Sequence, residues 1–201
     1  MNYPNTIKDL IECFKKFPTI GEKSAERLAL ASLDMPEEVL NLFADSLKNI
    51  KIKIKKCSKC NNLTESDECS ICQDKKRDSS LLCIVENSKD INLMEKNGIF
   101  NGRYFVIENL ISPTNGLDPS SINLDKIIDV IKKDQVKEVI IAIKPSIEGE
   151  TTALYITKML EKYDVVVSRI ALGIPMGAEI DYVDALTLEM ALENRKIISE
   201  K

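Results

Sequence analysis

Four of the six cysteines stand in two closely spaced pairs, and their spacing points to metal chemistry. Cys57, Cys60, Cys69 and Cys72 form the pattern Cys-x2-Cys-x8-Cys-x2-Cys. Each pair can direct two sulfurs at one point, and the spacer is long enough to bring the second pair back to the first. Thiolates are soft ligands that suit Zn²⁺, and a full set of four leaves no position for an activated water. We expect one structural zinc ion per chain, with disulfides or an iron-sulfur cluster as the alternatives.

The remaining cysteines and the missing histidines limit any further chemistry. Cys13 falls in a helical pattern and Cys83 in an apolar run, so we expect both to be packed as small hydrophobic side chains. The sequence contains no histidine. This excludes Ser/His/Asp and Cys/His catalysis and every histidine-ligated metal.

A basic helical hairpin is the second candidate site. Residues 17–29 join two helical patterns through a Pro-Thr-Ile-Gly turn, where we expect Gly21 to adopt a conformation closed to other residues. The second helix would present unpaired backbone N–H groups and a positive dipole end, which suit phosphate. The pattern resembles a helix-hairpin-helix, which binds the DNA backbone without reading sequence, although Thr19 replaces a common glycine. The candidate DNA-binding cations are Lys15, Lys16, Lys23 and Arg27. A hairpin used only for packing or dimerisation is the alternative.

Carboxylates that follow predicted strands form a third candidate site. Glu86 ends one apolar run, and Glu148 and Glu150 follow another. Carboxyl ends of parallel strands are where such sheets carry their sites. We treat these three residues as a candidate site for a partner or a weakly held ion, and ordinary surface carboxylates are the alternative.

This third site resembles the Toprim fold of topoisomerases and primases, in which a Glu and a later Asp-x-Asp hold Mg²⁺. The two aspartate positions are Lys144 and Ser146 here. Because Mg²⁺ requires oxygen ligands, a lysine at this place argues against metal-assisted phosphoryl chemistry. We expect a Toprim scaffold used for binding or assembly.

The elements that carry the hairpin are predicted to be helical. Apolar residues recur at helical spacing from Ile7 to Phe14, and this helix should end before Pro18. A second helix is expected over Ser24–Leu33, and a third begins at Pro36. Residues 56–79 hold few aliphatic side chains and need a metal or covalent staple.

From residue 80 short β-branched runs alternate with helical patterns, which favours a mainly parallel sheet covered on both faces. The expected strands are Leu81–Val85, Tyr104–Ile107, Glu138–Ile143 and Val165–Ile170. The expected helices are Ser88–Lys96, Ser121–Lys133, Thr151–Lys162 and Val183–Ile198. Gly98 should end the first of these helices with a positive φ.

Composition narrows the class of protein. The 201 residues carry a net charge of -4, which argues against nonspecific coating of nucleic acid by a monomer. A lysine-rich run over residues 48–59 is interpreted either as a solvated face or as a phosphate contact. No apolar run reaches the roughly 20 residues of a membrane span, so we expect a cytoplasmic protein with no membrane partner.

The order of hairpin, four-cysteine site and altered Toprim resembles the RecR family of bacterial recombination mediators over nearly the whole chain. Further matching runs are Cys83-Ile84-Val85-Glu86, Glu148-Gly149-Glu150-Thr151 and Gly173-Ile174-Pro175-Met176-Gly177-Ala178-Glu179-Ile180-Asp181-Tyr182-Val183-Asp184, the last resembling a Walker B-like motif. Glu108 and Asn109 stand where relatives carry glycines, and Lys144 where Asn is usual. No Gly-x4-Gly-Lys-Ser/Thr loop occurs, so nucleotide hydrolysis is not expected.

The resemblance implies an α/β multidomain protein without catalytic activity. It implies a helix-hairpin-helix region over 1–55, a four-cysteine zinc finger over 56–79, a Toprim domain over 80–174 and a C-terminal Walker B-like segment with a helix over 175–201. It also implies binding to double- and single-stranded DNA, RecO and RecF as partners, help in loading RecA at single-strand gaps, and a ring-like homotetramer. A metal-dependent Toprim nuclease or primase that uses Glu86, Glu148 and Glu150 is the alternative.

Overall fold

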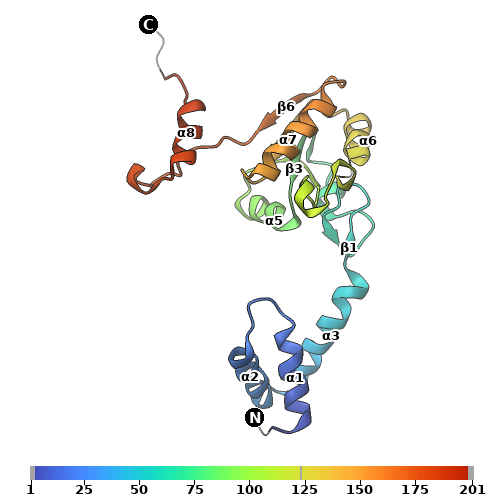
Figure 1. The fold of residues 1–201 in the computed structure, drawn as a ribbon. Helices are drawn as coiled ribbons and strands as arrows, with labels where there is room; N and C mark the ends of the chain where they lie inside the picture. Colours follow the sequence, from blue (N-terminus) through green and yellow to red (C-terminus); the bar gives the residue numbers. More distant parts are fainter. Residues whose placement is uncertain (1–2, 123, 199–201) are drawn as a thin grey trace. The chain divides into compact units, whose positions relative to one another are not determined.

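The computed structural model describes residues 3–122 and 124–198 and divides the chain into two compact units, Met1–Ile54 and Lys55–Lys201 (Figure 1). The first unit is helical. It contains α1 (Asn5–Lys15), α2 (Glu22–Ala31), a short 3-10 turn (Ser32–Asp34) and α3 (Glu37–Lys53). The second unit contains the cysteine segment, a parallel sheet with its helices and the C-terminal helix.

The hairpin is held together by a small apolar core between α1 and α2. Ile11, Ala25 and Ala29 are buried, because the helical spacing places them on facing sides of the two helices. Small alanines on α2 allow the two helices to approach closely. Partly buried residues complete this core: Tyr3, Ile7, Leu10, Phe14 and Ile20. As expected, α1 ends before Pro18, whereas α2 begins two residues earlier than its apolar pattern indicated.

In the turn between α1 and α2, the residue with a left-handed backbone conformation is not the one expected from the sequence. Gly21 has φ -87° and ψ 177°, an extended conformation open to every residue, so the expectation of a glycine-only conformation there is wrong. Thr19 instead has φ +69°. A left-handed conformation is costly for a β-branched residue, which explains why glycine suits this position of the motif.

The third helix leaves its apolar side chains exposed. Within the described residues, α3 has no buried side chain. Four large apolar residues of α3, and Ile54 directly after it, recur every three or four positions and form one stripe, which we call the α3 stripe: Val39, Phe43, Leu47, Ile50 and Ile54, each between 37% and 58% exposed. None of these five side chains is buried by the described residues of the first unit.

The cysteine segment forms a compact knuckle. Strands β1 (Lys55–Lys56) and β2 (Leu63–Thr64) pair antiparallel, and the one-turn helix α4 (Ser70–Gln73) follows. Residues 55–73 are called the zinc knuckle below. The four cysteines are its buried side chains together with Asn61.

A four-stranded parallel sheet forms the body of the second unit, in the order β4-β3-β5-β6. Its strands are β3 (Asp78–Val85), β4 (Gly102–Val106), β5 (Glu138–Ala142) and β6 (Val166–Arg169). Its helices are α5 (Ser88–Asn97), α6 (Leu124–Asp134) and α7 (Ile147–Leu160), with short 3-10 turns at Pro113–Asn115 and Pro119–Ser121. The predicted mainly parallel α/β architecture is therefore confirmed. Gly98 ends α5 with φ +60°, as expected.

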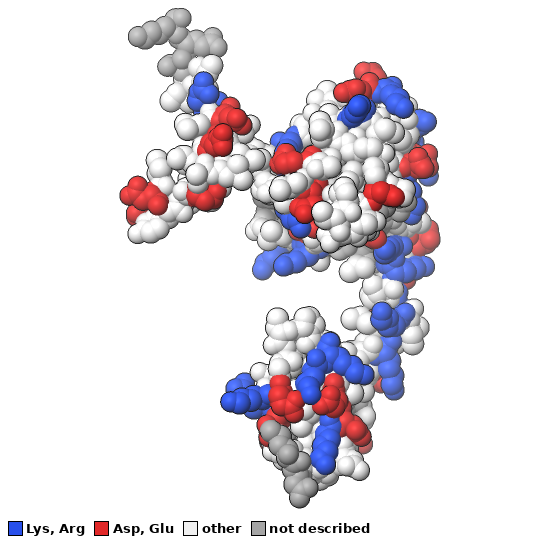
Figure 2. Space-filling model, viewed as in Figure 1, with Lys and Arg blue, Asp and Glu red and all other residues white. Residues whose placement is uncertain are grey.

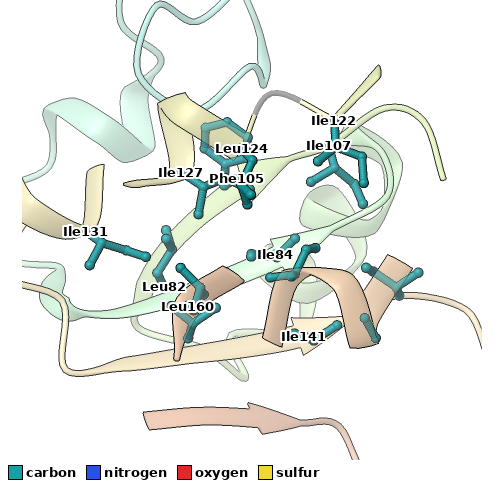
Figure 3. Close-up of a cluster of buried hydrophobic side chains, with 14 of the residues drawn as sticks. Leu82, Ile84, Phe105, Ile107, Ile122, Leu124, Ile127, Ile131, Ile141 and Leu160 are labelled. Carbon is teal, nitrogen blue, oxygen red and sulfur yellow. The ribbon is translucent and has the colours of Figure 1, made fainter. Parts of the chain in front are cut away.

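Apolar side chains alternate between the two faces of the sheet, and both faces are covered. One face carries Leu82 and Ile84 against α6 and α7, and Figure 3 shows this cluster with Phe105, Ile127 and Leu160. The other face carries a smaller cluster that packs on α5: Cys83, Val85, Ile91, Tyr104 and Val106. Because burying one such aliphatic side chain contributes about 1.5–3 kcal/mol, the larger cluster dominates the stability of this unit.

Several helix boundaries in the second unit differ from the sequence pattern, and α6 begins at Leu124, three residues after the expected Ser121. Ser146 accepts a hydrogen bond from the backbone N–H of Gly149 at 3.2 Å, so α7 begins four residues before the expected Thr151. The last helix, α8 (Ala185–Glu193), is shorter than expected and starts after Asp184, whose carboxylate accepts from the backbone N–H of Thr187 at 3.0 Å. A 3-10 turn at Ile180–Tyr182 precedes it.

Candidate metal centre and nucleic-acid interface

The four cysteines of the zinc knuckle converge on one point. Their sulfur atoms all lie within 4.8 Å of one another, and all four residues are buried. Cys57 and Cys60 come from the turn after β1, whereas Cys69 and Cys72 flank the start of α4. The spacing of the pattern thus produces the four-sulfur cage that a closed tetrahedral site requires.

The chemistry of this donor set fits zinc. The sulfurs of Cys60 and Cys69 lie 3.6 Å apart, so these are neighbouring thiols and not a disulfide. Hydrogen bonds from Cys60 and Cys72 lower the pKa of the Cys69 thiol. The backbone N–H of Cys69 also donates to the sulfur of Cys57 at 3.2 Å, as it would to a thiolate. Four buried sulfur ligands with no open position describe one structural zinc site.

The other two cysteines differ from each other. Cys83 is buried in β3, and burial raises the pKa of its thiol to about 12, so it is a packed hydrophobic residue as expected. Cys13 is exposed on α1, and the expectation that it is packed is wrong. Its position beside the apolar stripe of α1, not on it, accounts for the difference.

The hairpin cations fall into two groups. Lys15 is held by two carboxylates, since its ammonium nitrogen lies 2.7 Å from Glu12 and 2.7 Å from Glu22. These hydrogen bonds, first that to Glu12, raise the pKa of Lys15. Because these two carboxylates already neutralise its ammonium group, Lys15 attracts a phosphate less strongly than its position in the sequence indicated.

Lys16, Lys23 and Arg27 are exposed, and within the described residues they form no ion pair. Glu26 stands between two of them, but its carboxylate accepts a hydrogen bond from the Tyr3 hydroxyl at 2.8 Å. Since α2 is capped by Gly21 with no side chain, the backbone N–H groups of its first turn stay accessible. Figure 2 shows several basic side chains gathered on the hairpin unit among acidic ones. Exposed cations beside a helix start have the charge that suits a phosphate group.

At the carboxyl edge of the sheet, a lysine contacts the expected carboxylate. The Lys144 ammonium nitrogen lies 3.3 Å from Oε1 of Glu86. Lys144 follows β5 and Glu86 follows β3, and these strands are neighbours, which brings the two residues together. The turn that places Lys144 needs Gly149, because a Cβ there would lie 2.0 Å from the Lys144 carbonyl oxygen.

A cavity of about 300 Å³ opens beside this pair. Glu86, Lys144 and Glu148 line it together with residues from the loop after β4: Glu108, Asn109, Leu110, Ser112, Asn115 and Leu117. Hydrogen bonds at the start of α7, first from its backbone and then from Ser146, lower the pKa of Glu148. The expected grouping of Glu86 with Glu148 is therefore present in one pocket.

Glu150 takes a different place from the other two carboxylates. Its oxygens lie 2.5 and 2.6 Å from the guanidinium nitrogens of Arg169 on β6, and this bidentate pair lowers the pKa of Glu150. It is absent from the residues that line the pocket beside Glu86. Glu150 thus ties α7 to the sheet.

Sequence patterns did not reveal two further charged contacts near these sites. Lys56 of β1 lies 2.5 Å from Glu108, which has φ +67° at the place where relatives of the resembled family carry glycine. Arg77 forms a forked ion pair with Glu95 of α5, and the Tyr104 hydroxyl donates to the same carboxylate at 2.7 Å. The presence of Glu108 at a position expected to hold glycine was a sequence signal of its positive φ. The pairings themselves join residues too far apart in sequence to be signalled locally.

Across residues 3–122 and 124–198, no helix has the length and apolar composition needed to cross a bilayer.

Models of known families match the chain in four consecutive segments. They are described as the helix-hairpin-helix of RecR over residues 7–51, the four-cysteine zinc finger domain of RecR over 54–74, a Toprim domain over 80–171 and the C-terminal segment of RecR over 173–196. Together the matches follow the hairpin, the knuckle, the sheet and the C-terminal segment.

Curated proteins resemble the chain over nearly its full length. Recombination protein RecR of Natranaerobius thermophilus is 42% identical over 195 residues, which cover 97% of this chain and 98% of that protein. Recombination protein RecR of Staphylococcus haemolyticus and that of Staphylococcus saprophyticus are each 43% identical with the same coverage.

Proposed function

The chain belongs to the RecR family of recombination proteins, and on that premise we propose that it is a non-catalytic mediator that encloses DNA as a ring. Membership assigns it to DNA recombination and repair, with a hairpin domain that binds DNA and one structural zinc. The proposal adds four features. The chain assembles into a homotetramer, binds RecO and RecF, helps load RecA at single-strand gaps, and performs no chemistry on DNA.

The observation that carries the absence of chemistry is the Lys144 contact with Glu86. A Toprim enzyme needs a divalent cation between these strand ends, and that cation needs anionic oxygen ligands. The Lys144 ammonium already supplies a positive charge to Glu86, and Ser146 is used to begin α7. A divalent ion would have to displace the lysine, and neither Lys144 nor Ser146 offers it a carboxylate.

The proposed DNA contacts are the cations of the hairpin. Lys16, Lys23 and Arg27 are exposed close to the open start of α2, while Lys15 contributes less because Glu12 and Glu22 hold it. Contacts of this kind bind phosphates of double- or single-stranded DNA without reading bases. The chain as a whole has a net charge of -4, so a single copy would bind DNA weakly.

Assembly of several copies resolves this charge problem. Counterion release grows with the number of phosphates contacted, so hairpin cations repeated around one bore act together. The α3 stripe supports assembly, because large apolar side chains on one helix face are not buried by the described residues of their own unit. The exposed apolar residues Ile180, Leu186 and Leu192 of the C-terminal segment give similar support.

We also propose the domain limits 1–55, 56–79, 80–174 and 175–201, and a place of action in the cytoplasm at the nucleoid. Limited proteolysis of the zinc-loaded protein tests the limits, because cleavage should concentrate near residues 55 and 175.

The proposed function is tested by incubating the purified protein with labelled single- and double-stranded DNA and Mg²⁺ or Mn²⁺. We expect a mobility shift that weakens as salt rises, with DNA strands unchanged in length. Cleavage or primer synthesis would favour the metal-dependent nuclease or primase. A scaffold whose hairpin only packs would give no shift even when assembled.

A further inference from the structure

Strand β4 lies at the edge of the sheet. Its strand neighbour is β3, so the backbone groups on its other side need partners from elsewhere. Within β4, Tyr104, Phe105 and Val106 are aromatic or β-branched, and the one charged residue, Arg103, pairs with Asp134. An open edge of this composition is a template for pairing with a strand of another molecule.

The zinc knuckle forms hydrogen bonds with Val106, the last residue of this edge strand. The backbone N–H of Val106 donates to the carbonyl oxygen of Cys60 at 2.9 Å. The carbonyl oxygen of Val106 accepts from the side-chain amide of Asn61 at 3.1 Å. Two consecutive knuckle residues therefore satisfy both backbone groups of one edge residue, as a neighbouring strand would.

Asn61 is built for this contact. It is 5% exposed and has φ +60°, a conformation that asparagine tolerates better than most residues. Its side-chain oxygen accepts from the Lys126 ammonium at 3.2 Å, which fixes the orientation of the amide. Its own N–H donates to the Cys57 carbonyl at 3.0 Å, within the turn that carries two of the four sulfurs.

The near end of β4 is held by a residue just after the knuckle. A guanidinium nitrogen of Arg77 lies 3.3 Å from the Gly102 carbonyl oxygen and 3.4 Å from that of Phe100. Ile71 of α4 packs against the cysteine cluster and against the small core that contains Tyr104 and Val106. The knuckle thus contacts this strand through its backbone and through its side chains.

We propose that the zinc knuckle is a metal-dependent cover of the β4 edge, and that loss of zinc opens this edge to pairing with β4 of a second copy. The knuckle holds few aliphatic residues, so the metal keeps the turn at Cys57–Cys60 folded. Without that turn, Cys60 and Asn61 lose the geometry that places them on Val106. A second copy is the occupant because it offers an identical strand edge, whose one charged side chain, Arg103, is already paired with Asp134.

Hydrogen exchange of the full-length protein, with and without a zinc chelator, tests the proposal at single amides. In dilute chelated protein the Val106 amide should exchange at least about tenfold faster, while Val139 and Ile141 of the central strand β5 stay protected. At high concentration, protection of Val106 should return as edges pair. Unchanged Val106 exchange, equal loss of protection in β5, or no recovery with concentration would each overturn the proposal.

A substitution provides a test in which zinc stays bound. Asn61→Asp replaces the amide donor with an oxygen that repels the Val106 carbonyl, so Val106 should exchange faster at full zinc content. Asn62→Asp is the matched control, because Asn62 uses its side-chain oxygen to accept from Leu63 at 2.9 Å and the aspartate keeps that oxygen. Equal Val106 exchange in the two zinc-loaded variants would contradict the role of Asn61.

Discussion

The ammonium nitrogen of Lys144 lies 3.3 Å from Oε1 of Glu86, at the strand ends where a Toprim enzyme would hold its divalent ion. The two residues follow the neighbouring strands β5 and β3, so the sheet itself enforces their approach. A single positive charge carried on a flexible stem can neutralise Glu86 but cannot organise oxygen ligands in an octahedron. The sheet therefore supports binding and assembly better than phosphoryl chemistry.

Replacing this lysine should create a metal site. Lys144→Asp places a third carboxylate near Glu86 and Glu148, and we expect Mn²⁺ binding with a Kd on the order of 0.1–1 mM. Electron paramagnetic resonance of free Mn²⁺ measures it. Lys137→Asp, the same charge change at the opposite end of β5, is the control and should bind no more Mn²⁺ than the parent. Equal binding by parent and Lys144→Asp would show that the lysine does not block the site.

Charge reversal on the hairpin should abolish most DNA retention. The double substitution Lys23→Glu and Arg27→Glu should weaken DNA binding at least about tenfold and flatten its salt dependence, because phosphate contacts are lost. Fluorescence anisotropy at several salt concentrations measures both effects. Lys158→Glu with Lys162→Glu, on exposed residues of the second unit, makes the same change in net charge. If both pairs weaken binding equally, the hairpin is not the DNA site.

Lys15 provides an internal comparison on the same hairpin. Because Glu12 and Glu22 already hold its ammonium, Lys15→Gln should reduce DNA affinity less than Lys23→Gln does. A larger loss for Lys15→Gln would mean that DNA displaces both carboxylates.

The turn of the hairpin should gain stability from glycine at position 19 and should tolerate alanine at position 21. Thr19→Gly removes a left-handed β-branched residue and should stabilise the first unit by about 0.5–1 kcal/mol. Gly21→Ala should be close to neutral, since a Cβ there meets nothing within 4 Å and the backbone is extended, while alanine caps a helix less well than glycine. Urea unfolding followed by circular dichroism measures both. Destabilisation by both variants would contradict the turn geometry.

Acid should weaken the second unit through Glu95. The hydrogen bonds from Arg77, and then that from Tyr104, hold the pKa of Glu95 below its ordinary value. A carboxylate whose pKa is lower in the folded state stabilises the protein at pH values above its ordinary pKa. This stabilisation is lost as the pH falls through the lowered pKa. Glu95→Gln should therefore reduce the melting temperature at pH 7, and the difference should shrink below a pH of about 4. Glu161→Gln, an exposed residue at the end of α7, should change neither.

Local patterns in the sequence were sufficient for the four-cysteine cluster, the four strands of the parallel sheet and the presence of the longer helices, but not for the short elements β1, β2 and α4. The cysteine spacing and the β-branched runs are patterns of residues close together in the sequence. Such patterns were enough to predict the four-sulfur cluster and the parallel sheet. Ser146 was interpreted only as a lost metal ligand, so its role in starting α7 was missed. The pairs Lys56 with Glu108 and Arg169 with Glu150 depend on tertiary packing, which no local spacing encodes.

The strain at Thr19 shows a different limit of sequence patterns. A β-branched residue is rare at positive φ, so propensity favoured Gly21 as the special residue of the turn. The neighbouring Ile20 packs against the hairpin core, a tertiary contact that local propensity does not include. Cys13 was also misjudged from the sequence. It is exposed because it lies beside the apolar positions of its helix and not among them.

The most direct test is retention of the protein on closed circular duplex DNA in the presence of Mg²⁺. Circles loaded with protein are washed at high salt, and half are then linearised by a restriction enzyme. We expect protein to remain on the intact circles, to leave the linear DNA by its ends, and to leave every strand uncut. Equal release from circles and linear DNA, or nicking of the circles by the protein alone, would contradict a passive ring.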